Sequence, residues 1–168
     1  MSLDIPELRS DDVAKIAEGK ARFAFDALRV PVLVDDTGFS VDALNGFPGP
    51  YAAFVLHTIG YQGILKLMEG VEERGARFTT AIAYSDEKGV QVFSGMIEGT
   101  IARKPRGAGG FGYDPIFQYG TLTLAELPLA EKSRISHRAQ ALARFRDWFF
   151  GANAPQERKP LRDPTALL

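Results

Sequence analysis

The sequence has no cysteine among its 168 residues, and it has only two histidines and one tryptophan. The lack of cysteine excludes a disulfide scaffold, cysteine-ligated zinc and thiol catalysis. Long hydrophobic runs are also missing, since none approaches the roughly 18 residues of a membrane span, and no segment resembles a secretory signal. We therefore expect a soluble, cytoplasmic protein that has no membrane partner.

An excess of charge of either sign is missing as well. Twenty Lys and Arg residues face twenty-one Asp and Glu residues, for a formal net charge of −1. A nearly neutral chain has no overall field that would attract nucleic acid, so we expect no nucleic-acid partner. With 45% apolar residues, residues 1–151 are expected to form one globular domain. Residues 152–168, polar and interrupted by three prolines, are expected to be a loosely ordered tail.

The chain intermixes helical and β patterns. Apolar spacing predicts a helix that begins at Ser10 and ends before Pro31. It also predicts a last helix that is capped by Ser136 and whose buried face consists of Leu142, Phe145, Trp148 and Phe149. Alternating, β-rich segments at 78–84 and 90–101 are joined by a glycine-containing turn at 86–89, which is typical of a β-hairpin. This mixture favours an α/β fold.

Two adjacent carboxylates, Asp35 and Asp36, follow the apolar residues 32–34, which we interpret as a short buried strand that ends at the acids. Ligands of open sheets often bind just beyond the ends of strands. A carboxylate there can hold Mg²⁺ or orient an attacking water molecule. Because neighbouring side chains on a strand point to opposite faces, only one of the two should reach a given site. The alternative is an Asx-turn that merely closes the loop.

A glycine-rich loop at 106–112 follows the predicted hairpin. It leads into Tyr113-Asp114-Pro115 and not into a helix, so it lacks the helix N-terminus of a P-loop. Its backbone N–H groups could bind an anion with the help of nearby basic residues, or the loop could be a simple extension of the hairpin. Phe111 and Tyr113 could stack on a base or belong to the core.

Three basic or ionisable residues, Lys132, His137 and Arg138, lie near the start of the last helix. Helix N-termini favour anions, Arg binds phosphate through two donors, and Lys adds a point charge. His137 could instead be a surface or capping residue. Together with the acids, this group indicates a phosphate-binding protein with an acidic metal site.

In combination, these segments resemble the inosine triphosphate pyrophosphatase (Ham1-like) family, in particular its archaeal-type members. The resemblance covers roughly residues 4–150. It rests on five motifs in a fixed order: Val34-Asp35-Asp36-Thr37-Gly38, Gly46-Phe47-Pro48-Gly49-Pro50-Tyr51, Phe111-Gly112-Tyr113-Asp114-Pro115-Ile116-Phe117, Glu131-Lys132 and Ser136-His137-Arg138. Long motifs in a fixed order are far more specific than a lone glycine loop.

The resemblance implies an elongated two-lobed α/β fold with a mixed, curved sheet, a homodimer and a Mg²⁺-dependent reaction. The family hydrolyses noncanonical purine nucleoside triphosphates (ITP, dITP and XTP) to the monophosphate and pyrophosphate. Carried over by motif, Asp36 is the metal-binding acid and proton acceptor, with Asp35 beside it. The residues implied to bind substrate are Thr37, Phe111, Gly112, Tyr113, Asp114, Lys132, His137 and Arg138.

The chain departs from the family pattern near its start. Its first residues resemble the segment before the family's second helix, so we expect this sequence to lack the first strand and the Ser/Thr-x-Asn-x-x-Lys phosphate loop. Lys15 aligns with a metal-binding glutamate of the family, and Glu18 lies one turn further along. A smaller departure is Ser133, where the family usually has asparagine.

Three interpretations follow from the sequence. The first is a nucleoside triphosphate pyrophosphatase, and the second is a family-derived protein that binds nucleotides without efficient turnover. The third is an aspartic protease half-site, because Asp36-Thr37-Gly38 matches the active-site tripeptide of those enzymes. The predicted helices disfavour the third interpretation, since that fold is almost entirely β.

Overall fold

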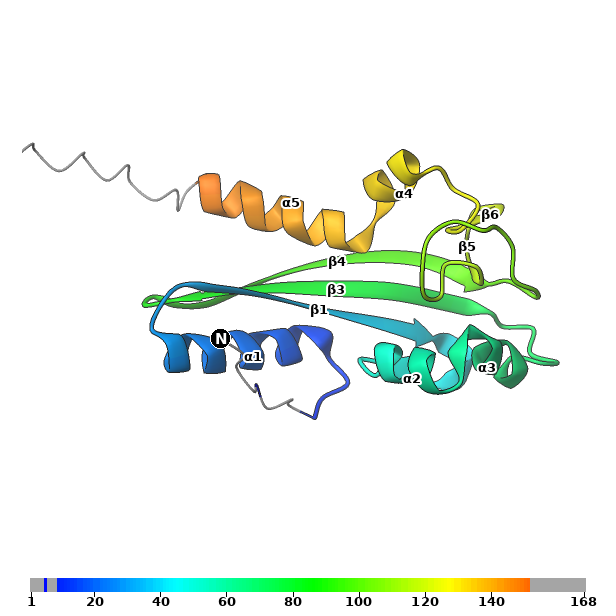
Figure 1. Cartoon of the computed structure of the whole chain (residues 1–168), viewed down its shortest axis with the longest axis horizontal. Coiled ribbons are helices and arrows are strands. Elements are labelled where there is room, and N and C mark those ends of the chain that lie inside the picture. Colours follow the sequence, from blue (N-terminus) through cyan, green and yellow to red (C-terminus); the bar gives the residue numbers. More distant parts are fainter. Residues whose placement is uncertain (1–4, 6–8, 152–168) are drawn as a thin grey trace, which may run out of the picture.

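The computed structural model describes residue 5 and residues 9–151, and the tail predicted at 152–168 lies outside the described residues. The molecule is elongated along its longest strands (Figure 1). The helices are α1 (Val13–Leu28), η1 (Asp42–Leu44), α2 (Ala52–Thr58), α3 (Gly60–Leu67), α4 (Leu129–Ile135) and α5 (His137–Phe150). The strands are β1 (Val32–Val41), β2 (Pro48–Gly49), β3 (Gly75–Asp86), β4 (Gly89–Ile101), β5 (Phe117–Tyr119) and β6 (Leu122–Thr123).

These six strands form one sheet in the order β2-β1-β3-β4-β5-β6. The predicted hairpin is confirmed as β3 and β4, which pair along their whole length from Gly75 opposite Thr100 to Asp86 opposite Gly89. The α/β fold is confirmed too. Where the family resemblance implies a mixed sheet, every strand pair among the described residues is antiparallel.

The prediction that the first strand stops at the acids is wrong. β1 runs on through Asp35, Asp36, Thr37 and Gly38 to Val41, and each of these residues has a partner on β3. The other edge of β1 pairs with β2 only at Phe39 and Ser40 among the described residues. Polar side chains are tolerated there because this part of the strand borders solvent. The Asx-turn alternative is therefore excluded.

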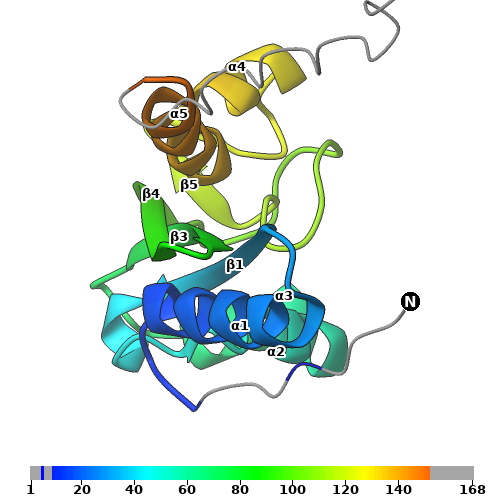
Figure 2. The same cartoon turned by 90° about the vertical axis from the view of Figure 1, so that its left-hand side faces the viewer.

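The helices cover both faces of the sheet. Figure 2 shows α1 below the sheet, together with α2 and α3, and α4 and α5 above it. Small side chains let α1 lie close to the strands: Ala17 and Ala21 pack with Ala81 and Ala83 of β3 in one buried cluster. The larger core cluster gathers at the other end of the sheet around Phe39, where Phe78, Tyr113 and Phe117 pack against one another.

Of the two helix caps predicted from the sequence, Ser136 is confirmed and Ser10 is wrong. Ser136 caps α5 as predicted, since its hydroxyl accepts a hydrogen bond from the Ala139 N–H. For α1 the cap is Asp12, which accepts from the Ala14 N–H, and not Ser10. A carboxylate next to the helix start is favoured at this position by the helix dipole.

The predicted buried face of α5 is confirmed in part. Phe145, Trp148 and Phe149 pack around Tyr84 of β3. Leu142 is 49% exposed, and the fully buried residue of the helix is Ala141. A small residue is needed there because α5 approaches β4 closely, and a Cβ on Gly95 of β4 would collide with the His137 carbonyl oxygen. Gly95 thereby sets the position of His137 over the sheet.

Candidate active site

The strand β1 carries the acids and sends them to opposite faces of the sheet. Alternation along a strand places Asp36 on the α1 face and both Asp35 and Thr37 on the α5 face. The side-chain contacts agree, since Asp36 pairs with Lys20 of α1 and Asp35 pairs with Arg138 of α5. The prediction that only one acid reaches a given site is therefore confirmed.

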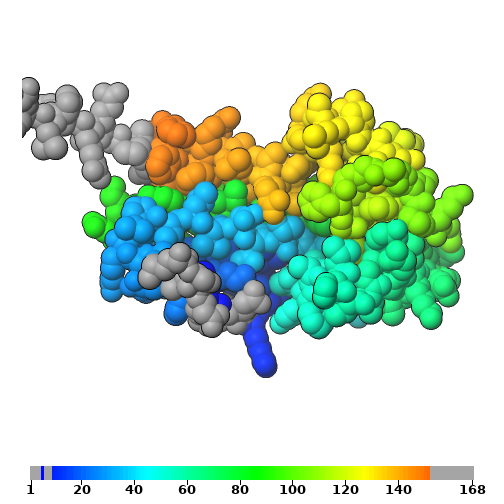
Figure 3. Space-filling model, viewed as in Figure 1, coloured from blue at the N-terminus to red at the C-terminus, as the bar shows by residue number. Residues whose placement is uncertain are grey.

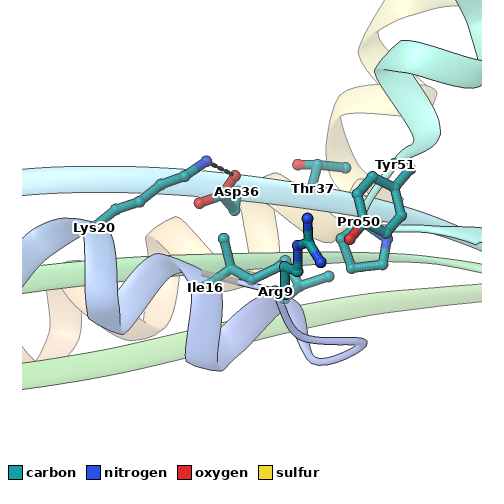
Figure 4. A pocket seen from close by; sticks show the side chains of 8 residues that line it. Arg9, Ile16, Lys20, Asp36, Thr37, Pro50 and Tyr51 are labelled. Atoms are coloured by element: carbon teal, nitrogen blue, oxygen red, sulfur yellow. Dashed lines mark hydrogen bonds and ion pairs between the residues drawn. The ribbon is translucent and has the colours of Figure 1, made fainter. Parts of the chain in front are cut away.

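A cavity of about 210 Å³ lies on the α1 face, lined by Arg9, Val13, Ile16, Lys20, Asp36, Thr37, Pro50 and Tyr51. In Figure 4 the Lys20 side chain reaches from α1 to Asp36, and Arg9 rises between them and Tyr51. Nζ of Lys20 lies 2.8 Å from Oδ1 of Asp36. The second oxygen, Oδ2, is buried and has no hydrogen-bond partner among the described residues. This cavity thus combines a carboxylate oxygen that can still accept with two cationic side chains.

A second cavity, of about 360 Å³, lies on the α5 face. Its lining includes Thr37, Phe111, Gly112, Tyr113, Asp114, Lys132, His137 and Arg138, together with apolar residues of α2 and β4. All substrate-binding residues implied by the resemblance therefore border one cavity. Figure 3 shows the lime and yellow segments, which span this region of the chain, stacked above the teal α2 and α3 at one end of the molecule.

Lys132 and Phe111 form one wall of the second cavity. The Lys132 ammonium makes an ion pair with Asp114 and lies 4.6 Å from the centre of the Phe111 ring. Asp114 is buried and also accepts a hydrogen bond of 2.7 Å from the Phe111 N–H. Asp114 therefore holds the Lys132 ammonium and the Phe111 backbone in place, while the Phe111 ring, 75% exposed, is open to stack on a planar ligand.

Of the two roles considered for Tyr113, stacking on a base or packing in the core, the structure shows core packing. Its ring is 4% exposed and stacks on Phe39, with ring centres 4.3 Å apart. The hydroxyl donates to the Ala52 carbonyl oxygen at 2.8 Å, and burial raises the pKa of Tyr113 to about 12. Tyr113 therefore supports the cavity from below, and its hydroxyl is already engaged.

His137 lies at the first position of α5 and stacks on Phe78 at 5.1 Å. Its Nδ1 lies 2.6 Å from the Thr80 hydroxyl, which in turn lies 2.6 Å from the Thr37 hydroxyl. Burial, followed by the nearby Arg138 charge, lowers the pKa of His137 to about 4. The histidine is therefore neutral at pH 7 and is one member of a hydrogen-bonded network, not a surface group.

Arg138 follows His137 and turns toward β1, where its Nε lies 2.9 Å from Oδ2 of Asp35. Both side chains are about half exposed, so the pair is open to solvent and to a ligand. Asp35 thus positions Arg138 at the border of the second cavity. Thr37, two residues along the same strand, lines both cavities and marks where they meet.

Several sequence expectations have other outcomes. Lys15 is exposed on α1 and does not line the Asp36 cavity, and Glu18 pairs with Arg22 at 2.6 Å. Two of the basic residues near the glycine loop are paired with acids, Arg103 with Glu72 and Arg106 with Glu126. The 106–112 segment is a structured border of the second cavity through Phe111 and Gly112.

Sequence reasoning missed Lys20, Thr80 and Gly95. Lys20 had a signal, because it follows Val13 and Ile16 at helical spacing and so lies on the apolar stripe of α1. A lysine on such a stripe needs a buried acidic partner. Thr80 and Gly95 carry no comparable signal, since their roles depend on contacts across the sheet with His137.

A divalent metal fits the first cavity only in a limited way. Within residue 5 and residues 9–151, no three acidic or histidine side chains gather into a metal site. Mg²⁺ is nevertheless often held by one or two carboxylates together with substrate phosphates and waters. Among the described residues that line this cavity, Asp36 is the one carboxylate, and its Oδ2 has no hydrogen-bond partner.

These features define an α/β protein whose two cavities meet at the edge of one strand. The cavity on one face is lined by acidic and cationic side chains, and the cavity on the other face by aromatic and basic ones. The Ham1 family model matches residues 1–148. A dITP/XTP pyrophosphatase of Methanopyrus kandleri is 51% identical over 152 residues, with 89% of this chain and 81% of that protein covered. The same enzyme of Methanosarcina mazei is 49% identical, with 87% and 80% covered.

A solved structure has the same fold at lower sequence identity. The Ham1 protein of Staphylococcus aureus superposes with a TM-score of 0.84 at 33% identity, covering 89% of this chain and 81% of that one. The chain belongs to the Ham1 family. Among the described residues, none of the helices combines the length and apolar character needed to cross a lipid bilayer.

Proposed function

We propose that this chain hydrolyses noncanonical purine nucleoside triphosphates, among them dITP, XTP and ITP, to the monophosphate and pyrophosphate. Relatives covered over about four-fifths of their length are named dITP/XTP pyrophosphatases. The structural observation that carries the proposal is the meeting of two unlike cavities at Thr37. One offers charges of both signs, as a triphosphate and its water nucleophile need, and the other offers an aromatic and basic wall for a base.

The base is assigned to the second cavity. Phe111 stacks on the purine, and Lys132, His137 and Arg138 face its polar edge. A 6-oxo purine presents an acceptor where adenine presents an amino donor, so donors aimed at that position reject adenine. The rejected purine would leave buried donors unpaired, at a cost of about 1–3 kcal/mol for each group.

The phosphates are assigned to the first cavity. Lys20 and Arg9 supply positive charge, and the carboxylate of Asp36 accepts the proton from a water molecule that attacks the α-phosphorus. A bond forms between the water oxygen and the α-phosphorus, and the bond from that phosphorus to the bridging oxygen breaks. Pyrophosphate leaves with the bridging oxygen and the electron pair. Asp35 contributes on the other face by holding Arg138.

Mg²⁺ is part of the proposal, with Asp36 as the protein ligand through Oδ2. When bound, it would neutralise charge on the phosphate oxygens. Lys20 contacts Oδ1, so Oδ2 is the oxygen that would hold the cation. Removal of Mg²⁺ by a chelator is therefore expected to stop pyrophosphate release.

A second candidate is nucleotide binding without efficient turnover. The observation that favours it is the ion pair of Lys20 with Asp36, in a cavity where the described residues supply few further metal ligands. A protein of this kind would bind dITP in preference to dATP but release no pyrophosphate.

We further propose a homodimer that acts in the cytoplasm, where nucleoside triphosphates are made and used. Support for a dimer comes from apolar side chains left open on α5, where Phe150 is 70% exposed and Leu142 is 49% exposed. Sedimentation equilibrium measures the mass directly, and a monomer at all concentrations would refute this part of the proposal.

The proposed activity is tested by pyrophosphate release from dITP, XTP and dATP, each with Mg²⁺ and with a chelator. We expect Mg²⁺-dependent release from dITP and XTP, far slower release from dATP, and a monophosphate as the second product. Release of inorganic phosphate from dITP would indicate a different reaction. Tight binding of dITP with no release would support the second candidate.

A further inference from the structure

The side chain of Thr80 lies between Thr37 and His137, which both border the second cavity. It is 0% exposed, lies on β3 directly opposite Thr37 of β1, and contacts His137 from below. Its hydroxyl lies 2.6 Å from the Thr37 hydroxyl and 2.6 Å from Nδ1 of His137. A buried hydroxyl with two short hydrogen bonds constrains the orientation of both of its partners.

The hydroxyl has a single proton, so it can donate to only one of its two partners. If Thr80 donates to His137, Nδ1 is the acceptor and the imidazole proton lies on Nε2. If Thr80 donates to Thr37, Nδ1 carries the proton and Nε2 has the lone pair. The direction of these two hydrogen bonds therefore decides whether Nε2 of His137 is a donor or an acceptor toward a ligand.

We propose that the Thr80 hydroxyl donates a hydrogen bond to Nδ1 of His137 and accepts one from the Thr37 hydroxyl. This fixes His137 as the Nε2–H tautomer and makes it a donor to the 6-oxygen of the purine. Thr80 is thus a positioning residue for base discrimination, although it lines neither cavity. The choice of tautomer rests on the proposed function, because an acceptor at Nε2 would favour the amino group of adenine.

Three further observations fit this role. The low pKa of His137 keeps the ring neutral at pH 7. Its hydrogen bonding to a ligand therefore depends on the tautomer and not on the charge. The ring is clamped by stacking on Phe78. Nε2 makes no hydrogen bond within the described part of the chain, and the ring borders the second cavity. Nε2 is therefore the ring nitrogen left for a ligand.

The test compares Thr80→Val, which keeps the shape and removes the hydroxyl, with Thr80→Ser, which keeps the hydroxyl. Thr79→Val is the matched control, because it makes the same change one residue away on the opposite face of β3. The first readout is ¹⁵N NMR of the histidine rings in the free protein, which has only two histidines to assign. The second is the ratio of kcat/KM for dITP to that for dATP.

In the wild type we expect a protonated Nε2 and an unprotonated, hydrogen-bonded Nδ1 for His137. Thr80→Val should give mixed tautomer signals and lower the dITP-to-dATP ratio by about tenfold, whereas Thr80→Ser and Thr79→Val should retain both wild-type readouts. A protonated Nδ1 in the wild type would overturn the inference, as would unchanged signals and an unchanged ratio in Thr80→Val. Because the NMR measurement needs no substrate, an inactive wild type would refute the proposed function while leaving the tautomer result readable.

Discussion

Nζ of Lys20 lies 2.8 Å from Oδ1 of Asp36, while Oδ2 of the same carboxylate is buried without a hydrogen-bond partner among the described residues. One oxygen is thus bound to Lys20 of the helix α1, and the other has no protein partner among the described residues. This division suits a carboxylate that must keep its orientation and still accept a proton or contact a cation.

Asp36→Asn is expected to lower kcat for pyrophosphate release by about 10²–10⁴-fold, because the amide cannot accept the proton of the attacking water. Asp35→Asn is the matched variant, since it makes the same change on the other face of β1. There we expect mainly a higher KM, because Arg138 loses its partner. Steady-state kinetics with dITP measure both parameters. Equal losses of kcat in the two variants would contradict the separate roles of the acids.

Lys20→Met is expected to lower the free energy of unfolding by about 1–3 kcal/mol, because it leaves a largely buried carboxylate without its cation. Arg22→Met is the control on the same helix, since the Arg22–Glu18 pair is exposed and should contribute no more than about 0.5 kcal/mol. Urea unfolding followed by circular dichroism measures the two changes. Similar changes in the free energy of unfolding for the two variants would mean that the Lys20–Asp36 pair stabilises the fold no more than an exposed ion pair does.

Gly95→Ala is expected to destabilise the fold by about 1–3 kcal/mol and to weaken dITP binding. The added Cβ would collide with the start of α5 and push His137 and Arg138 away from the sheet. Met96→Ala, at the neighbouring exposed position, serves as the control and should change stability by about 0.5 kcal/mol or less. Thermal unfolding and calorimetric titration with dITP measure the effects, and normal binding by Gly95→Ala would refute this account of the glycine.

Acid is expected to destabilise the wild type more than His137→Asn. The pKa of His137 is lowered from 6.5 to about 4 in the folded protein, so the unfolded chain takes up a proton first as the pH falls. The contribution of the neutral ring is complete above pH 6.5 and is lost as the pH falls toward 4. Urea unfolding of both proteins at several pH values measures the difference, which should shrink through this window. A constant difference would show that the ring is not held neutral by the fold.

The sequence predicts an element of the fold well when the residues that determine it lie close together in the chain. The β3–β4 hairpin and the Ser136 cap of α5 follow from turn and cap chemistry within a few residues. The length of β1 does not, because Asp35 to Gly38 look like a strand end and are kept extended by pairing with β3. The same limit applies to Thr80, whose function depends on two partners 43 and 57 residues away.

The sequence predicts which residues belong to the candidate site, but it does not predict how they are arranged in space. Family motifs name the residues from Phe111 to Arg138 that border the second cavity. Strand alternation separates Asp35 from Asp36, yet no sequence pattern shows which of the two acids faces that cavity. The cation opposite Asp36 is Lys20 and not Lys15, because the helical phase of α1 turns Lys15 to solvent.

In the proposed function the two cavities form one nucleotide site, bent around the edge of β1. Its most direct test is backbone NMR of the Asp36→Asn variant, titrated separately with dIMP, with pyrophosphate and with dITP. We expect dIMP to shift signals around Phe111 and His137, pyrophosphate to shift those around Arg9 and Lys20, and dITP to shift both sets with a single affinity. Shifts from dITP confined to one cavity, or two sets that saturate at different concentrations, would contradict it.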